Sequence, residues 1–467
     1  MRILTIAFAS LLFLSSCKKW SKEKLDIAQA DVPVAQPISD AAPLCGSIKG
    51  TMLTGKTYTI GCDVTINAGD TLIIQPGVHI DVKNKSGIFV KGSLISLGTK
   101  TQQVFITVDS LRALKNDAPN QDPAHDPAFA GGWAGLYCAS TCPMLILKWT
   151  HVEFGGAGLS IAQGAIVNQS AGAAYSILFQ NPNGIFVMED SWLYGGVDDP
   201  IRISNGKICF MRSTFEKAGL KGGDCLNCKG GTTGDMAYNL FVGIATNGQK
   251  ASNKGQPVGA PQTNIRMWNN TFIECGWRQI QTGRGANINF EEGAKGMAYN
   301  NLMVNCKFGL RIVNNPAADT ANIRYGNNYE YGDSLKIVNQ IYPTNAGLSG
   351  GWTNPQSTDI PDYHSFLPSN YHYGDTYDGT PVIKQNNPMF YNFPLPVAGN
   401  IPLFGIQAVG NFDFRLQPGS PAIGKGFTGL TPLGTVPIDP KYGVTEMTLP
   451  GIDIGAFQLN GTGNQHY

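Results

Sequence analysis

A short motif repeats along the middle of the chain, between about Lys148 and Glu330. Each copy has an apolar run, a polar pair, a second apolar run and a turn that contains Gly. The second residue of the polar pair recurs about every 23 to 31 residues, an interval typical of stacked repeats. These residues are Asp190, Ser213, Asn239, Asn270, Asn301 and Asn328. The pattern predicts a solenoid in which each repeat forms one coil and inserted loops change its length.

The composition of each repeat favours strands and turns. Ile, Val, Phe and Tyr fill the short runs, Gly, Asn and Asp bound them, and none shows the periodicity of a helix. In stacked parallel coils, equivalent residues lie about 4.8 Å apart. We therefore expect Asn269/Asn270, Asn300/Asn301 and Asn327/Asn328 to form an amide ladder at one corner, where Asn tolerates a left-handed backbone. The alternative is that Asn pairs are simply common in loops.

Segments on both sides of the repeats extend the pattern. Residues 70–82 (DTLIIQPGVHIDV) and 87–99 (GIFVKGSLISLGT) precede them, and residues 412–426 (FDFRLQPGSPAIGKG) and 452–457 (IDIGAF) follow them. These segments resemble the opening and closing parts of right-handed parallel β-helix proteins of the pectate-lyase-like type in the bacterial envelope. The resemblance covers most of the chain from about residue 44 onward. It implies an all-β solenoid with long loop insertions but no single activity, because one fold hosts many functions.

The start of the chain indicates export. Met1–Cys17 contains one Arg, an apolar run from Ile3 to Leu14 and the ending Leu-Ser-Ser-Cys. This is typical of a secretory signal and is shorter than the roughly 20 apolar residues that span a bilayer. The ending resembles the lipobox of bacterial lipoproteins, which implies cleavage before Cys17 and lipidation of its thiol. We expect an outer-membrane lipoprotein on the periplasmic or cell-surface face; an ordinary signal peptide is the alternative.

The sequence thus divides into five segments with different expected roles. The long insertion is rich in aromatic and acidic residues, and loops of this length are usually functional or disordered. The segments are 1–17, a lipoprotein signal; 18–43, a flexible tether; 44–345, the β-helix; 346–395, the aromatic and acidic loop; and 396–467, the closing segment of the β-helix.

Charge and cysteine content narrow the possible partners. The formal net charge is +1, which gives no reason to expect a nucleic-acid partner. Ten cysteines less Cys17 leave nine, so at least one thiol is expected to be unpaired in a compartment that permits disulfides. Cys209 is the expected unpaired residue, and metal or redox use of the Cys-x-x-Cys motif is the lesser alternative. The candidate pairs are Cys45 with Cys62, Cys138 with Cys142, Cys225 with Cys228, and Cys275 with Cys306, the last as a bridge or a buried thiol stack.

The aromatic and acidic loop is the candidate ligand-binding segment. Flat aromatic rings offer an apolar face for sugar stacking, and carboxylates accept hydrogen bonds from hydroxyl groups. The alternative is that the aromatics only pack the loop against the solenoid. No cofactor is expected, although the Asp residues of the loop make calcium possible. The predicted sugar-binding residues are Trp352, Tyr371, Tyr373 and Tyr377.

Candidate catalytic residues lie on neighbouring repeats. The resemblance implies lyases that combine a calcium-binding carboxylate with a basic residue, or hydrolases with an Asp pair. The candidates are Asp198, Asp199, Asp224, Asp235, Arg278 and Arg284. The catalytic signatures of pectate lyases and polygalacturonases are missing, and Asp198 and Asp199 also suit a solvated turn. The sequence therefore predicts an envelope protein with a binding or display role, most of all toward a polysaccharide. The alternative is a polysaccharide lyase or glycoside hydrolase acting on an acidic glycan.

Overall fold

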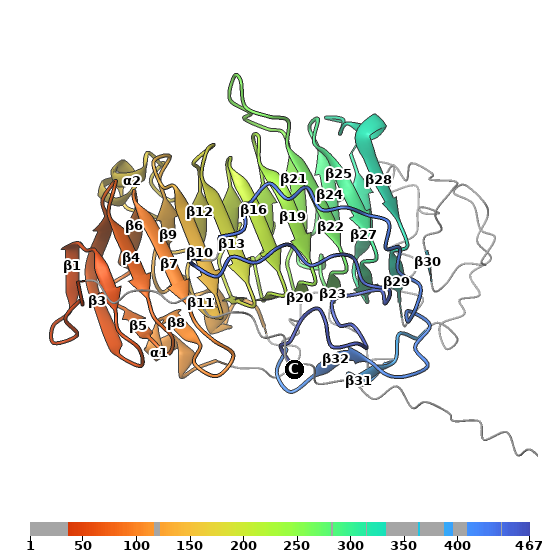
Figure 1. Cartoon of the computed structure of the whole chain (residues 1–467), viewed down its shortest axis with the longest axis horizontal. Coiled ribbons are helices and arrows are strands. Elements are labelled where there is room, and N and C mark those ends of the chain that lie inside the picture. The colour runs from red at the N-terminus through yellow and green to blue at the C-terminus, as the bar shows by residue number, and fades with distance from the viewer. Residues whose placement is uncertain are drawn as a thin grey trace, which may run out of the picture.

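The computed structural model describes residues 36–115, 122–281, 284–313, 315–332, 363–364, 387–395, 409–439 and 441–467. The chain forms a right-handed parallel β-helix, which confirms the predicted fold class (Figure 1). Each full coil gives one strand to each of three parallel ladders, so strands that follow one another in sequence lie on different sides of the coil. We call the outer surfaces of these ladders the first, second and third faces.

The strands of the three ladders are short, and their parallel pairing is continuous from coil to coil. The first ladder contains β2 (Gly50–Met52), β4 (Thr71–Ile74), β7 (Ser93–Leu97), β10 (Met144–Lys148), β13 (Ile185–Glu189), β16 (Lys207–Met211), β19 (Thr233–Ala237), β22 (Asn264–Trp268), β25 (Lys295–Tyr299) and β28 (Ile323–Gly326). The second contains β1 (Leu44–Ser47), β3 (Thr57–Ile66), β5 (His79–Val82), β8 (Val104–Thr107), β11 (Thr150–Glu153), β14 (Trp192–Tyr194), β17 (Thr214–Glu216), β20 (Leu240–Val242), β23 (Thr271–Ile273), β26 (Leu302–Val304), β29 (Tyr329–Tyr331) and β30 (Tyr363–His364). The third contains β6 (Gly87–Val90), β9 (Gly135–Cys138), β12 (Ile177–Phe179), β15 (Ile201–Ile203), β18 (Leu226–Cys228), β21 (Gln249–Ser252), β24 (Ala286–Glu291) and β27 (Phe308–Ile312), and its first strand pairs with the second half of β3.

The interior of the coil is apolar and stacked. Inward side chains from all three ladders form one continuous core. Within it, the rings of Phe215, Phe241 and Phe272 stack on successive coils with centroids 4.8 and 4.7 Å apart. Burial of such side chains contributes about 1.5–3 kcal/mol each, so the core drives the stacking of coils.

The Asn corner between the first and second ladders confirms the predicted amide ladder. Asn270 donates two hydrogen bonds to Oδ1 of Asn301, one from its backbone N–H (3.1 Å) and one from its side-chain Nδ2 (2.9 Å). Asn301 repeats this pattern with Asn328. The preceding residues Asn269 and Asn300 have φ of 50° and 58°, the left-handed conformation expected there. One of the predicted ladder positions is wrong by one residue. Glu189 pairs with Met211, so Ser191 rather than Asp190 holds the position of Ser213 in the ladder.

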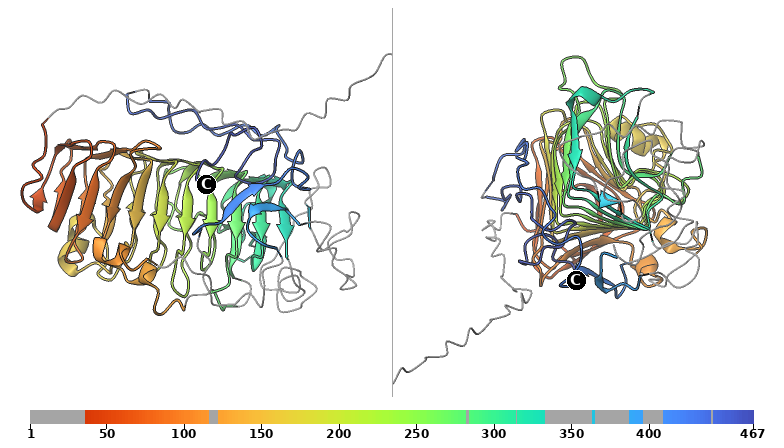
Figure 2. Two further views of the ribbon diagram at one scale, coloured as in Figure 1. Left: turned by 90° about the horizontal axis from the view of Figure 1, so that it is seen from below. Right: turned by 90° about the vertical axis from the view of Figure 1, so that its right-hand side faces the viewer.

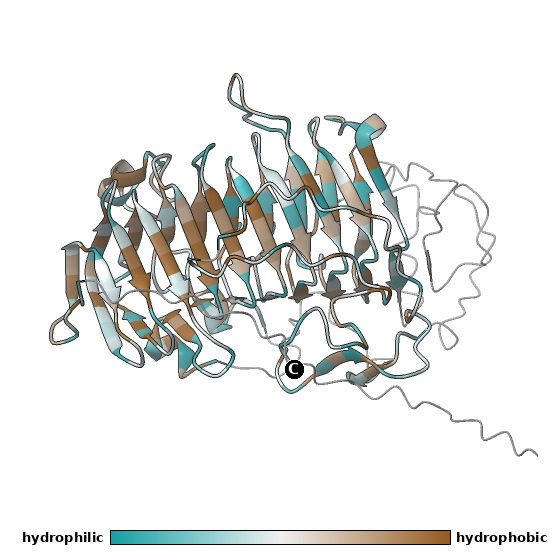
Figure 3. Ribbon diagram, viewed as in Figure 1, coloured by the Kyte–Doolittle hydropathy of each residue, from teal (hydrophilic) through white to brown (hydrophobic). Residues whose placement is uncertain are grey.

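The C-terminal segment packs back along the coils and covers two faces. Residues 409–439 and 441–467, the C-terminal strap, cross the first face from Phe427, beside Tyr299, to Gly443, beside Lys148, and then return to Gly451 (Figure 1). The strap packs against apolar side chains of the first ladder, which include Ile146, Val187 and Trp268. Figure 3 shows that hydrophobic residues are frequent along the strands. Its own β32 (Asp413–Leu416) pairs antiparallel with β31 (Phe390–Asn392), and residues around this pair cover part of the second face (Figure 2).

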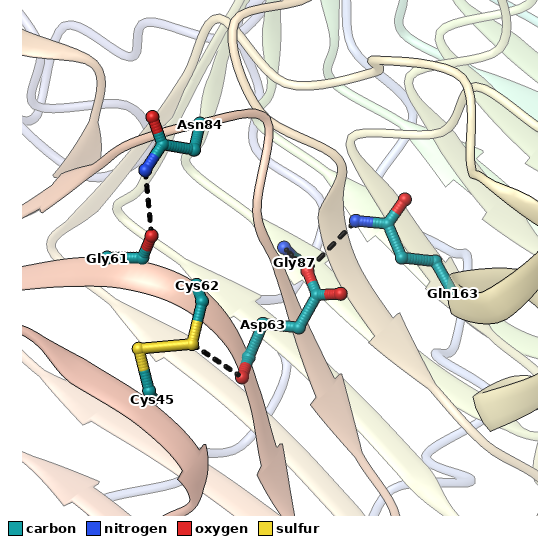
Figure 4. Close-up of a disulfide and its surroundings, with 7 residues drawn as sticks. All are labelled: Cys45, Gly61, Cys62, Asp63, Asn84, Gly87 and Gln163. Carbon is teal, nitrogen blue, oxygen red and sulfur yellow. Dashed lines mark hydrogen bonds between the residues drawn. A yellow bond between two sulfur atoms is a disulfide. The ribbon is translucent and has the colours of Figure 1, made fainter.

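Two features secure the N-terminal end. Cys45 and Cys62 form a disulfide with a Cα–Cα distance of 5.0 Å, as predicted (Figure 4). Close to it, Gln163 of the helix α2 (Ile161–Val167) donates to Oδ1 of Asp63 at 2.9 Å. The other short helical elements are α1 (Asp109–Arg112), η1 (Pro127–Phe129) and η2 (Thr320–Asn322). In the part of the chain that the structure describes, no helix has the length and apolar character needed to cross a membrane.

Candidate functional site

The third face changes character halfway along the solenoid. Phe89, Tyr137 and Leu178 occupy one outward column on successive coils, and the segment around α2 packs over them. From β15 onward the same column is polar. Its residues are Arg202, Asn227, Lys250, Asn289 and Arg311, paired in register from coil to coil. Among the described residues, the C-terminal strap hydrogen-bonds to the first and second ladders and their corners and to none of this column.

A second column of polar side chains precedes these strands. Oδ1 of Asp199 accepts the backbone N–H of Asp224 at 2.8 Å, and its Oδ2 accepts Nδ2 of Asn227 at 2.6 Å. Oδ1 of Asp224 in turn accepts Nδ2 of Asn247 at 2.6 Å. Parallel coils thus bring Asp199, Asp224 and Asn247 together from residues that are far apart in sequence. We call the two columns, with Lys229 and Glu291 beside them, the polar patch.

Lys250 joins the acidic groups of the polar patch. Its Nζ lies 3.1 Å from Asp224 and 2.9 Å from Glu291. Burial alone would lower the pKa of this lysine, but the two carboxylates outweigh it and raise the pKa to about 12. Lys250 is therefore charged at any physiological pH, and it fixes the positions of both carboxylates.

Two aspartates beside the polar column have raised pKa values. Burial, followed by repulsion from Asp224, raises the pKa of Asp199 to about 6. The same two causes raise the pKa of the exposed Asp198. Paired carboxyl groups with raised pKa values are frequent at functional sites, although ion-pair networks also produce them.

Several groups of the polar patch lack an ionic or hydrogen-bond partner among the described residues. Lys229 and Arg311 have no carboxylate within 4.0 Å among the described residues, and burial lowers the pKa of both side chains. Oδ1 of Asn227, Oδ1 of Asn247 and Nε of Arg311 are buried and make no hydrogen bond. Buried polar groups are normally paired, so these atoms mark places for a ligand or for ordered water.

An aromatic side chain lies at one end of the polar patch. The guanidinium of Arg202 lies over the ring of Tyr175, 5.5 Å from its centroid, and 3.6 Å from Oδ2 of Asp199. Tyr175 is half-buried at the junction with the apolar part of the third face. The site therefore combines a ring, cations, carboxylates and amides along one line of coils.

The six predicted catalytic residues separate into different places. Asp198, Asp199 and Asp224 come together in the polar patch, and the exposed Arg284 lies at its rim, close enough to lower the pKa of Arg311. Asp235 lies on the first face, where its carboxylate accepts the backbone N–H groups of Leu433 and Gly434 at 2.9 Å.

Arg278 has a structural position. Its guanidinium donates to the backbone carbonyls of Ala218 and Gly219 and lies over the ring of Phe129. These contacts are within the corner that follows the second ladder. The expectation that Asp235 and Arg278 would converge with the other candidates is therefore not met, since both are already engaged by backbone groups of neighbouring segments.

The remaining cysteine candidates are free, buried thiols in the described chain. Cys138 contacts Cys142, and Cys275 contacts Cys306 on the next coil, which agrees with a buried thiol stack rather than a bridge. Cys228 faces the core at a position that neighbouring coils fill with Ile203 and Ala251. Cys225 and Cys228 therefore act as small apolar core residues, and the redox or metal alternative gains no support. The predicted unpaired Cys209 lies between the first face and the strap, beside Met447.

Some predicted residues lie outside the described chain. They are Cys17, Trp352, Tyr371, Tyr373 and Tyr377, so the lipidation site and the predicted sugar-binding loop are not described. Among the residues that the structure does describe, no group of three or more His, Cys, Asp or Glu side chains is arranged to hold a metal ion.

The outward column of the polar patch was missed from the sequence. Four of its five members are one polar residue between two apolar ones, as in Ile-Arg-Ile at 201–203, Leu-Asn-Cys at 226–228 and Ile-Asn-Phe at 288–290, whereas Lys250 follows Gln249. This tripeptide is a local signal only, because the loops between the strands differ in length and hide the register. Searches for similar proteins gave no match among protein families, characterised proteins or solved structures. A function for this protein is therefore inferred from the geometry of the chain itself.

Proposed function

We propose that the polar patch binds a polysaccharide that lies along the axis of the β-helix. The observation that carries this proposal is the outward column from Arg202 to Arg311, polar on five successive coils and not bound by the strap. Coils recur about every 4.8 Å, and a pyranose chain advances by a similar distance per sugar. An extended glycan can thus place every second ring near one of the half-buried cations Arg202, Lys250 and Arg311.

The chemistry of the polar patch suits hydroxyl-rich ligands. A hydroxyl group both donates and accepts, so it can pair with the half-buried guanidinium groups of Arg202 and Arg311 and with the half-buried carboxylate of Glu291. Lys229 and Arg311 add cationic groups without carboxylate partners, which favours a glycan that also carries carboxylate or sulfate groups. Tyr175 offers an aromatic surface at one end.

The proposal is tested by measuring binding to a panel of neutral and acidic glycans by isothermal titration calorimetry. Lys229→Met and Arg311→Met each remove one cation from the polar patch, and Lys207→Met removes an exposed cation from the first ladder as a control. A hydrogen bond to a charged group contributes about 1.5–3 kcal/mol, so each patch variant should bind about 10- to 100-fold more weakly. Binding that is equal in all variants, or absent across the panel, would contradict the proposal.

A second candidate function is cleavage of the bound glycan. The raised pKa of Asp199 provides a carboxyl group that can donate a proton, and Asp224 places a second carboxyl group near it, as in the carboxyl pairs of glycoside hydrolases. This candidate predicts new reducing ends, or absorbance at 235 nm if the reaction is an elimination. Both signals should be lost in Asp199→Asn and kept in Asp235→Asn. Binding without either signal would leave a display or binding protein.

We also propose that the protein is held at the outer membrane by a lipid on Cys17. The support is the order of basic, apolar and small residues in Met1–Cys17. Two or more acyl chains give stable attachment, whereas one chain binds only marginally. Metabolic labelling with a radioactive fatty acid should mark the wild-type protein and not Cys17→Ser.

A further inference from the structure

A column of stacked rings runs along the second face and ends on the last described segment. His79, Phe105, His151 and Trp192 occupy equivalent positions on successive coils, with ring centroids 5.9, 4.3 and 4.1 Å apart. The ring of His466 then stacks on Trp192 with a centroid distance of 3.6 Å and an interplanar angle of 13°. A side chain from the strap thus adds one more ring to a column built by the coils.

Hydrogen bonds fix His466 in this position. Its Nδ1 lies 2.8 Å from the hydroxyl of Thr214, which is the residue paired with Trp192 on the next coil. The adjacent Asn464 donates Nδ2 to the backbone carbonyls of Ser213 and Tyr238, at 3.3 and 3.2 Å. The docked segment, residues 464–467, therefore closes over a position where the coil itself provides only a small hydroxyl side chain.

The surroundings of the ring disfavour the protonated, positively charged form of His466. Its Nε2 is buried. Burial lowers the pKa of His466 well below its usual range, and the nearby His151, Arg212 and Lys100 act in the same direction. The backbone of Asp190 opposes this effect.

Several charged or titratable side chains surround His466. Arg212 is held by two 2.8 Å hydrogen bonds to the carboxylate of Asp190. His151 lies 3.6 Å from Glu153, but burial still lowers its pKa. Acidification therefore brings no new negative charge toward His466.

We propose that the docked segment is a pH-sensitive latch, in which protonation of His466 releases residues 464–467 and uncovers the ring column at Trp192. The sign follows from linkage, because the docked form holds the neutral imidazole while the released form titrates near the ordinary value of 6.5. Docking is complete above about pH 6.5 and weakens as the pH falls below it. Between pH 7.5 and pH 5.0 the released form should gain up to about 30-fold over the docked form, the limit reached when the docked imidazole stays neutral throughout.

Hydrogen exchange measured by mass spectrometry tests the latch, with rates corrected for the intrinsic effect of pH. The peptide that contains residues 464–467 should lose protection, by up to about 30-fold, between pH 7.5 and pH 5.0 in the wild-type protein. His125→Phe, which removes an exposed histidine, should behave like the wild type. His466→Phe and His466→Gln do not titrate, so whichever of them docks at pH 7.5 should keep its protection at pH 5.0.

Three results would overturn the proposal. One is equal protection of the wild-type segment at both pH values. Another is the same loss of protection at pH 5.0 in a docked His466→Phe or His466→Gln variant, because another group would then be responsible. The third is full protection of His466→Lys at pH 7.5, since a permanent charge at this position should release the segment.

Discussion

Single residues show where the sequence was sufficient and where it was not. Asn270 and Asn301 could be assigned to a corner ladder because side-chain chemistry and spacing agree. Each bonds to its equivalent on the next coil, and the Asn before it accepts the left-handed backbone. Arg202 and Lys250 could not be aligned in the same way. The loops between them differ in length, so sequence spacing does not give their register, and only the paired strands place them in one column.

Asp199 should give the protein an unusual pH dependence. Its native pKa of about 6 is above the ordinary 3.8, so proton uptake favours the native state as the pH falls. Between pH 7.5 and pH 5.0 the wild type should gain about 1.4 kcal/mol of unfolding free energy relative to Asp199→Asn. Urea unfolding at both pH values measures this difference. The exposed Asp122→Asn should show no such gain, and parallel pH curves for wild type and Asp199→Asn would disprove the assignment.

Among the larger elements, the strap has the clearest structural role. It covers the apolar first face, and its residues show no periodic pattern because the strap contains almost no regular strand. The segments at 412–426 and 452–457, which resemble the closing segments of β-helix proteins, lie along the coils. Asn327 donates Nδ2 to the carbonyl of Lys425, and Gly455 donates its N–H to the carbonyl of Asn300.

Removing one anchor should loosen the strap. Asp235→Ala leaves the N–H groups of Leu433 and Gly434 without their acceptor, and a hydrogen bond to a charged group contributes about 1.5–3 kcal/mol. We expect at least a tenfold faster hydrogen exchange in residues 425–439 and little change in the coils. Asp439→Ala is the control, because that carboxylate accepts from Lys441 within the strap. Unchanged exchange in Asp235→Ala would show that apolar contacts alone hold the strap.

At the scale of the molecule, stability is distributed along one axis. Each inner coil packs against two neighbours, whereas the first coil packs against only one and depends more on local cross-links. The Cys45–Cys62 disulfide closes a loop with a sequence separation of 17 at this end. This arrangement makes the N-terminal end the place where unfolding is expected to begin.

Reduction of that disulfide should lower the unfolding free energy by about 3 kcal/mol, the value expected for a loop of this length. Urea unfolding with and without dithiothreitol measures the effect. Cys45→Ser should be equally destabilised and insensitive to the reductant, because the other described cysteines are free thiols. A wild-type protein that ignores dithiothreitol would show that the bridge adds nothing to stability.

The position of the strap also has a consequence for biosynthesis. Lys148 contacts Gly443, which is 295 residues later in the chain, so the coils of the first face leave the ribosome long before the segment that covers them. Until then Ile146, Val187 and Trp268 form an exposed apolar strip of the kind that promotes aggregation of partly folded chains. A nascent or truncated chain that lacks the strap should therefore depend on chaperones, and a C-terminal truncation is more damaging than its length suggests.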